Sequence, residues 1–199
     1  MIRQASDVAR RFGARLPTIA AERVELRWME HGDVPALFEI FGDPAVMRFW
    51  SCPAYSDEAQ AGALLEQIHA CYREGTLLEW GLCRRDDPRV IGTATLSHLD
   101  WSNGRAELGY SQARAHWGHG YVREALTALL GWAFGELGLR RIEADVDPRN
   151  AASIRTLEAL GFQREGYLRE RWNVAGEVQD ALFYGLLARE WTPPRQGAR

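Results

Sequence analysis

The feature that most constrains this chain is a long amphipathic run that lies between two strand-like segments. Residues 122–137 place apolar side chains along one continuous helical stripe: Val122, Ala125, Leu126, Leu129, Leu130, Ala133, Phe134 and Leu137. Gly138 follows the run and predicts its end. Residues 105–112 and 140–146 have strand patterns, and alternate residues of the second share an apolar face: Ile142, Ala144 and Val146. This order predicts two roughly parallel strands joined by a right-handed crossover.

The segments outside this unit predict further strands and three more helices. Strands are expected over residues 23–29, 79–85, 89–100, 162–172 and 178–188, with the second and third joined by a turn. Helices are expected over residues 32–44, 56–75 and 150–161. Together these patterns predict an α/β fold with a mixed, mostly antiparallel central sheet around a strand–helix–strand core.

Small polar residues and glycines predict where two of these helices begin and end. Ser56 is the expected N-cap of the helix that ends at Gly75. Asn150 is the expected N-cap of the helix that ends at Gly161.

The length of 199 residues suits a single domain. Residues 1–21 are rich in arginine and poor in acids, and we expect a flexible arm or a partner-contact segment there. The domain is expected over residues 22–192. Residues 193–199 are expected to form a flexible tail.

Composition excludes several classes of function. The net charge of −3 gives no reason to expect nucleic-acid binding, and no apolar run approaches the ~18 residues of a membrane span. Three widely spaced cysteines fit reduced thiols in the cytoplasm better than a disulfide framework. The five histidines share no metal-ligand spacing with acids or cysteines, so no metal site is expected.

A pair of glycines stands immediately before the long helix. Gly118 and Gly120 follow a strand, and backbone N–H groups at such a helix start favour a bound anion. A purely structural turn is the alternative. The turn lacks the Gly-Lys-Ser/Thr of a nucleotide-binding P-loop, and Arg123 stands where a dinucleotide fold would carry its third glycine.

A second motif makes a family resemblance specific. The stretch "NAASIRTLEALGF", residues 150–162, has the form Asn-x-x-Ala/Ser followed by Leu-Gly-Phe. With the glycine turn and the strands around it, the chain resembles the GNAT-type N-acetyltransferases over residues 22–191. It is most similar to the branch that includes the ribosomal-protein N-terminal acetyltransferases.

The resemblance implies a GNAT-like fold that takes acetyl-CoA as the acyl donor. The family's phosphate turn, Gln/Arg-x-x-Gly-x-Gly/Ala, falls on residues 117–122, with Trp117 in place of a polar residue and Val122 in place of a small one. The residues implied in binding are Leu108, Gly109, Tyr110, Trp117, Gly118, His119, Gly120, Tyr121, Val122, Arg123, Asn150 and Arg155. Solvent-exposed roles are the alternative for the two arginines.

Two residues carry the implied chemistry of acetyl transfer to an amine. Glu107 resembles the branch's general base, acting through water, and its alternative role is an ion pair with Arg105. Ser153 is implied to hydrogen-bond the departing sulfur, and its alternative role is capping the helix. Many members carry a tyrosine four residues later, where this chain has Leu157.

The acceptor is expected to be the α-amine of a protein or peptide. An α-amine has a pKa near 8 and a lysine amine near 10.4, so deprotonation at pH 7 costs lysine about 3 kcal/mol more. Small-molecule amines and an acyl-CoA-binding regulator with little turnover are the alternatives. Trp50, Trp101 and Trp172 either wall the acceptor side or pack in the protein. The sequence leaves open whether the chain is a monomer or a homodimer.

Overall fold

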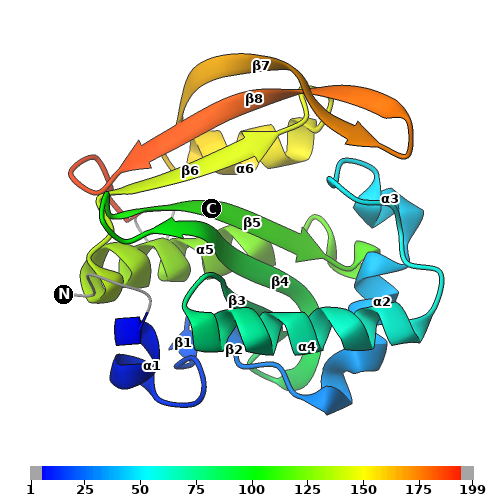
Figure 1. The fold of residues 1–199 in the computed structure, drawn as a ribbon, viewed down its shortest axis with the longest axis horizontal. Helices are drawn as coiled ribbons and strands as arrows, with labels where there is room; N and C mark the ends of the chain where they lie inside the picture. The colour runs from blue at the N-terminus through cyan, green and yellow to red at the C-terminus, as the bar shows by residue number, and fades with distance from the viewer. Residues whose placement is uncertain (1–5, 194–199) are drawn as a thin grey trace.

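A single eight-stranded sheet forms the centre of the computed structural model, which describes residues 6–193 (Figure 1). Its strands run in the order β1-β2-β3-β4-β5-β6-β8-β7. Their bounds are β1 (Ile19–Ala20), β2 (Val24–Arg27), β3 (Leu78–Arg84), β4 (Asp87–Asp100), β5 (Arg105–Gln112), β6 (Arg141–Val146), β7 (Gln163–Val174) and β8 (Glu177–Leu187). Among the strand pairs of residues 6–193, only β5–β6 is parallel. The predicted mixed, mostly antiparallel sheet is therefore confirmed.

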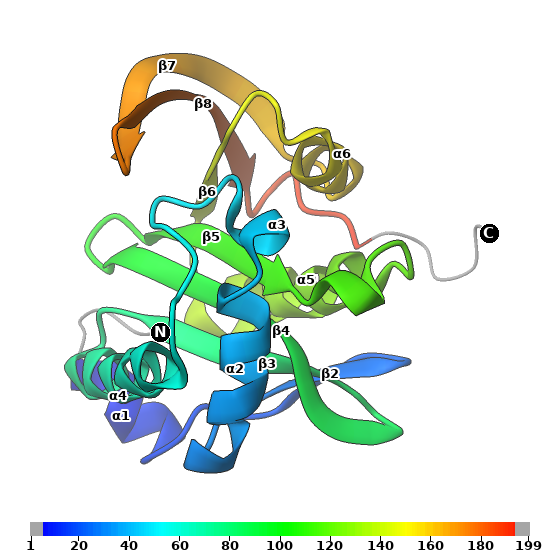
Figure 2. The same cartoon turned by 90° about the vertical axis from the view of Figure 1, so that its right-hand side faces the viewer.

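The sheet opens between its two parallel strands. β5 and β6 pair only from Arg105↔Arg141 to Glu107↔Glu143. Beyond this point β5 stays paired with β4, whereas β6 stays paired with β8. Figure 2 shows the two parts of the sheet, β1–β5 and β6–β8, diverging from this contact. The last residues of β5 therefore have one backbone edge without a strand partner.

Helices cover both faces of the sheet. α2 (Val34–Phe41), α3 (Pro44–Met47) and α4 (Glu58–Glu74) share one apolar cluster with side chains of β3 and β4. α5 (Tyr121–Trp132) continues into a π-helical turn, Ala133–Leu137, and packs its apolar stripe against the opposite face. α6 (Ala151–Ala159) belongs to the same cluster, in which its Leu157 lies with Tyr184 of β8. Short 3-10 turns occupy His31–Asp33 and Arg114–His116.

The described part of the N-terminal segment, where we expect a flexible arm or a partner-contact segment, packs onto the domain. It forms α1 (Ser6–Phe12) and β1, and the Tyr72 hydroxyl donates a hydrogen bond to the Gly13 carbonyl at 2.9 Å. Three of its apolar side chains are buried in the main core: Val8, Leu16 and Ile19. These contacts give residues 6–21 the packing of the domain itself.

Both ends of the chain extend past the described part of the structure. Residues 1–5 of the expected arm and residues 194–199 of the expected tail lie outside the described residues. Between them, no helix has the combined length and apolar character that a membrane crossing requires.

The helix ends follow the sequence with one correction. The Asn150 side chain accepts a hydrogen bond from the Ser153 backbone N–H at 3.1 Å, as expected of an N-cap, and Gly75 ends α4 with a φ of 68°. The N-cap of α4 is Asp57 and not Ser56, since the Asp57 carboxylate accepts from the Gln60 N–H at 3.1 Å. A carboxylate also interacts favourably with the positive end of the helix dipole.

Candidate active site

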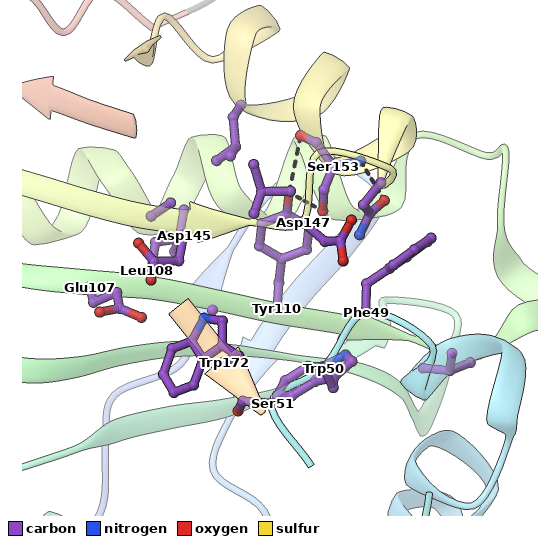
Figure 3. A pocket seen from close by; sticks show the side chains of 16 residues that line it. Phe49, Trp50, Ser51, Glu107, Leu108, Tyr110, Asp145, Asp147, Ser153 and Trp172 are labelled. Atoms are coloured by element: carbon purple, nitrogen blue, oxygen red, sulfur yellow. Dashed lines mark hydrogen bonds between the residues drawn. The ribbon is translucent and has the colours of Figure 1, made fainter. Parts of the chain in front are cut away.

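A cavity of about 180 Å³ lies where β5 and β6 diverge (Figure 3). Its walls come from β5, from β6 and the turn after it, from α6, from the segment after α3, and from Trp172 of β7. Ligand sites for drug-sized molecules usually measure about 300–1,000 Å³. This smaller volume fits a small group or the reactive end of a larger ligand, and we refer to it as the inner cavity.

A second cavity of about 540 Å³ adjoins the inner one and is bounded by the end of β5 and the first turns of α5 and α6. We refer to it as the outer cavity. Six residues line both: Val46, Phe49, Trp50, Tyr110, Asn150 and Ser153. A ligand bound in the outer cavity would therefore reach the inner one past these side chains.

Charged side chains of opposite sign line the two cavities. Among the described residues, three carboxylates and no arginine or histidine line the inner cavity: Glu107, Asp145 and Asp147. Three arginines and no carboxylate line the outer cavity: Arg48, Arg123 and Arg149. The outer cavity is therefore suited to an anionic ligand and the inner one to a cation.

Glu107 lies half-buried on β5 at the point where β6 separates from it. Its Oε2 atom is 3.5 Å from His98 Nδ1. Burial raises the pKa of Glu107; the nearby Asp145 also raises it, while His98 opposes the shift. The suggested Glu107–Arg105 ion pair is wrong, because Arg105 binds Asp100 and Glu143 instead. This leaves Glu107 facing the cavity, as a general base requires.

Tyr110 and Ser153 meet where the two cavities join. The Tyr110 hydroxyl lies 2.9 Å from Ser153 Oγ and 3.4 Å from the Ser153 carbonyl oxygen. Burial raises the pKa of Tyr110 to about 12, although its hydrogen bond with Ser153 lowers it. Tyr110 is therefore protonated at neutral pH and remains a hydrogen-bond donor. The capping role of Ser153 is also present, but it uses the backbone N–H and leaves the hydroxyl available.

Both glycines of the turn before α5 adopt left-handed backbone conformations. Their φ values are 79° for Gly118 and 76° for Gly120, which a residue with a Cβ rarely adopts. In the phosphate-turn pattern over residues 117–122, Gly120 occupies the glycine position, and Val122, at the last position, lies in the first turn of α5.

Most of the predicted site residues line the two cavities, but four residues do not. His119 stacks on Tyr121, with ring centroids 5.5 Å apart, and the Arg23 guanidinium lies over the Tyr121 ring. Arg155 is exposed and lines neither cavity. Trp101 donates a hydrogen bond to the Gly75 carbonyl at 3.1 Å and packs on the main core, whereas Trp50 and Trp172 line the inner cavity.

Sequence reasoning missed several residues that line the cavities. Arg149 and Asp147 stand directly before the Asn150 motif, so their position could have indicated them. Arg48 and Asp145 carry no such signal, because only the fold brings the segment after α3 and β6 to the same opening. Leu157 lies buried at the wall of the inner cavity, where it can donate no proton.

The outer cavity fits a long ligand that carries phosphates. None of the described residues accepts a hydrogen bond from the buried Gln112 Nε2 atom, and Gln112 lines this cavity. The unpaired edge of β5 offers backbone donors and acceptors beside it. Arg123 forms no ion pair within the described residues, so its charge is available to a phosphate.

Comparison with known proteins agrees with this geometry. The profile of the acetyltransferase (GNAT) domain matches residues 23–163. The chain belongs to the GNAT acetyltransferase family. It is therefore an acyltransferase, and the alternative of a regulator with little turnover is set aside. GNAT enzymes use acetyl-CoA as co-substrate and an amine as acceptor.

Individual relatives cover most of the chain. It is 36% identical to an uncharacterized N-acetyltransferase, p20, of Bacillus licheniformis, over 88% of this chain and 99% of that protein. It is 32% identical to the ribosomal protein uS5-alanine N-acetyltransferase of Escherichia coli (strain K12), over 67% of this chain and 69% of that enzyme. A GNAT-family acetyltransferase structure from Bacillus anthracis superimposes with a TM-score of 0.78 at 25% identity, covering 87% of this chain and 100% of the other.

Proposed function

We propose that this acetyltransferase transfers the acetyl group of acetyl-CoA to the α-amine of a protein or peptide. The observation that carries the proposal is the junction of two cavities of opposite charge at Tyr110 and Ser153, with Glu107 beside it. The arginine-lined cavity suits the phosphates of the donor. The carboxylate-lined cavity suits the ammonium group of the acceptor.

Bound acetyl-CoA would supply the activated acetyl group. Arg48, Arg123 and the backbone N–H groups at the start of α5 would hold its phosphates. The unpaired edge of β5, from Leu108 to Gln112, would hydrogen-bond its pantetheine arm and direct the thioester toward Ser153. Asn150 lines both cavities and can contact the same arm.

Glu107 would act as the general base. It takes a proton from the acceptor ammonium, directly or through one water, and so frees the amine lone pair for attack on the thioester carbonyl. Burial raises the pKa of Glu107 and so brings it closer to the pKa of an α-amine, which makes this proton transfer easier. Deprotonating a lysine amine at pH 7 would cost about 3 kcal/mol more than deprotonating an α-amine, so a single carboxylate suits the α-amine better.

Tyr110 and Ser153 would stabilise the departing sulfur. When Tyr110 donates its proton to Ser153 Oγ, the Ser153 hydroxyl hydrogen is free to be donated to the thiolate. This pair replaces the tyrosine that many relatives carry at the position of Leu157. Two coupled hydroxyls stabilise negative charge more than one does alone.

The ribosomal-protein acetyltransferase among the relatives supports a protein N-terminus as acceptor. The small volume of the inner cavity, about 180 Å³, also suits a small-molecule amine such as a polyamine, and this is the second candidate. Both candidates share the donor site and differ only in the acceptor.

A binding assay followed by an acceptor panel tests the proposal. Acetyl-CoA should raise the melting temperature of the protein. Thiol release should then be measured with Ala-Ala-Ala amide, Nα-acetyl-lysine amide and spermidine. We expect release with the peptide, and release only with the other two amines would overturn the α-amine assignment. Because the chain contains no lysine, its own side chains add no background to a test for lysine acetylation.

A further inference from the structure

Asp145 lines the inner cavity and has one buried carboxylate oxygen without a partner among the described residues. Its side chain is 8% exposed, and its Oδ2 atom accepts a hydrogen bond from Arg171 Nε at 2.9 Å. No described residue donates to its Oδ1 atom. Figure 3 shows Asp145 on the same side of the cavity as Glu107. A buried acceptor without a donor is unfavourable, so this atom points to a ligand that brings one.

The other acidic groups around this opening differ from Asp145. Asp147 has both oxygens bonded by Arg149, at 2.7 to 3.2 Å. Glu143 lies between Arg105 and Arg141 and binds both. Within the described part of the chain, the Glu107 carboxylate has one ion-pair partner, His98, at 3.5 Å. Asp145 Oδ1 and the Glu107 carboxylate are therefore the acidic groups of this cavity that can still accept hydrogen bonds from a ligand.

We propose that Asp145 Oδ1 binds the acceptor ammonium, beside Glu107, and so fixes the amine for deprotonation. The inference rests on the proposed function. An ammonium group carries three donors, enough to bond Asp145 and still direct a proton toward Glu107. Trp172 closes the same cavity, and the Arg171 guanidinium that holds Asp145 lies 5.1 Å from the Trp172 ring centroid. Arg171 thus contacts both Asp145 and Trp172.

The same charges define the class of acceptor. Three carboxylates and no cation line the inner cavity within the described residues. The oxygens that remain available, on Asp145 and Glu107, are acceptors, so a carboxylate next to the amine, as in a free amino acid, would meet acceptors and no donor from these two residues. The site should therefore take a primary ammonium whose neighbouring carbonyl is an amide, and should discriminate against free amino acids.

The test compares wild type with Asp145→Asn. Arg171 would donate its hydrogen bond to the amide oxygen of the new asparagine. The NH2 group of the asparagine, a donor, would then take the place of the acceptor Oδ1. We expect KM for Ala-Ala-Ala amide to rise at least tenfold while the Kd for acetyl-CoA stays unchanged. The Ki of propionyl-Ala-Ala amide, which lacks the amine, should not change. An unchanged KM would overturn the inference.

Further variants separate this role from a structural one. Asp86→Asn removes an exposed aspartate–arginine pair on the turn between β3 and β4, outside both cavities, and should leave KM unchanged. Arg171→Gln removes the ion pair but keeps the acceptor oxygen, so its KM should rise far less than that of Asp145→Asn. Equal increases would assign Asp145 a structural role and overturn the inference. Asp145→Ser provides a second small replacement if the asparagine variant melts early.

The failures of the two proposals are distinguishable. Absence of turnover with every amine of the panel would overturn the proposed function and this inference with it. Turnover by wild type with an equal KM in Asp145→Asn would overturn the inference alone. Equal rates with alanine amide and free alanine would contradict the proposed acceptor class.

Discussion

The Tyr110 hydroxyl on β5 lies 2.9 Å from Ser153 Oγ in the first turn of α6. The two residues are 43 positions apart in the sequence, and both line the two cavities. The contact therefore bridges the opening between β5 and β6 at its junction with the outer cavity. A pKa of about 12 keeps Tyr110 protonated, so it can support Ser153 throughout the neutral range.

Replacing either hydroxyl should slow the reaction. We expect Ser153→Ala and Tyr110→Phe each to lower kcat about tenfold. Ser153→Ala removes the hydrogen bond to the departing sulfur, and Tyr110→Phe removes the hydrogen bond that Tyr110 donates to Ser153. The double variant should lose little more than the worse single variant, since the two hydroxyls act through one hydrogen bond. Steady-state thiol release measures all three. Fully multiplicative losses would show that the residues act independently.

Glu107→Gln should lower kcat/KM at pH 7 by about 100-fold without changing the Kd for acetyl-CoA, since it removes only the base. The wild-type pH profile provides a second readout. A base works when deprotonated, and burial raises the pKa of Glu107, so activity should fall at a higher pH than for an ordinary glutamate as the solution is acidified. This fall of activity at low pH should be absent from the pH profile of Glu107→Gln. If the fall persists in that variant, it belongs to the titration of another group.

Arg123→Gln and Arg48→Gln should each raise the Kd for acetyl-CoA about tenfold, equivalent to about 1.4 kcal/mol. Both arginines line the outer cavity, where a charge-assisted hydrogen bond to phosphate is worth about this much. Isothermal titration calorimetry measures the change. Arg73→Gln is the matched control, because Arg73 is exposed on α4 and lines neither cavity. Equal Kd values for all three variants would contradict the phosphate role.

Glu79 should make the stability of the protein depend on pH. Its carboxyl is buried on β3, and burial raises its pKa from 4.5 to about 7, although hydrogen bonds from Thr95 and Thr93 oppose the shift. The folded state thus holds a proton that the unfolded state has lost between these values. The free energy of unfolding should therefore fall by up to ~3 kcal/mol as pH rises through this window.

Glu79→Gln should remove this dependence. Denaturant unfolding at pH 5 and pH 8.5 should find the variant more stable than wild type at the higher pH and closer to it at the lower one. The exposed Glu22→Gln is the control and should follow wild type. A wild-type stability that rises between the two pH values would contradict the assigned burial effect.

Local patterns in the sequence were enough to predict the fold. The stripe of α5, the alternation of β6 and the glycines at 75 and 138 each determine a local element, and the crossover rule then fixes β5 and β6 as parallel. The N-terminal segment was harder, because its few apolar residues become informative only once the core that buries them is known. The N-cap of α4 was hard to predict because two adjacent residues, Ser56 and Asp57, each have a side chain that can accept the capping hydrogen bond.

The site was predictable only where a motif marks it. Glu107, Ser153 and the glycine turn stand in recognisable stretches, and all line the cavities. Asp145 and Arg48 were missed because their importance comes from the separation of β5 and β6, which no local pattern reveals. The Tyr110–Ser153 contact has the same origin, since it joins a strand to a helix far along the chain.

The most direct test of the proposed function is the ratio of kcat/KM for Ala-Ala-Ala amide to that for Nα-acetyl-lysine amide at pH 7. Both probes offer one primary amine, and they differ in its pKa and its neighbours. Deprotonation alone should favour the α-amine by about 100-fold. A ratio well above one, with both values of kcat/KM lowered in Glu107→Gln, is the predicted result. A ratio below one would contradict the assignment of an α-amine acetyltransferase.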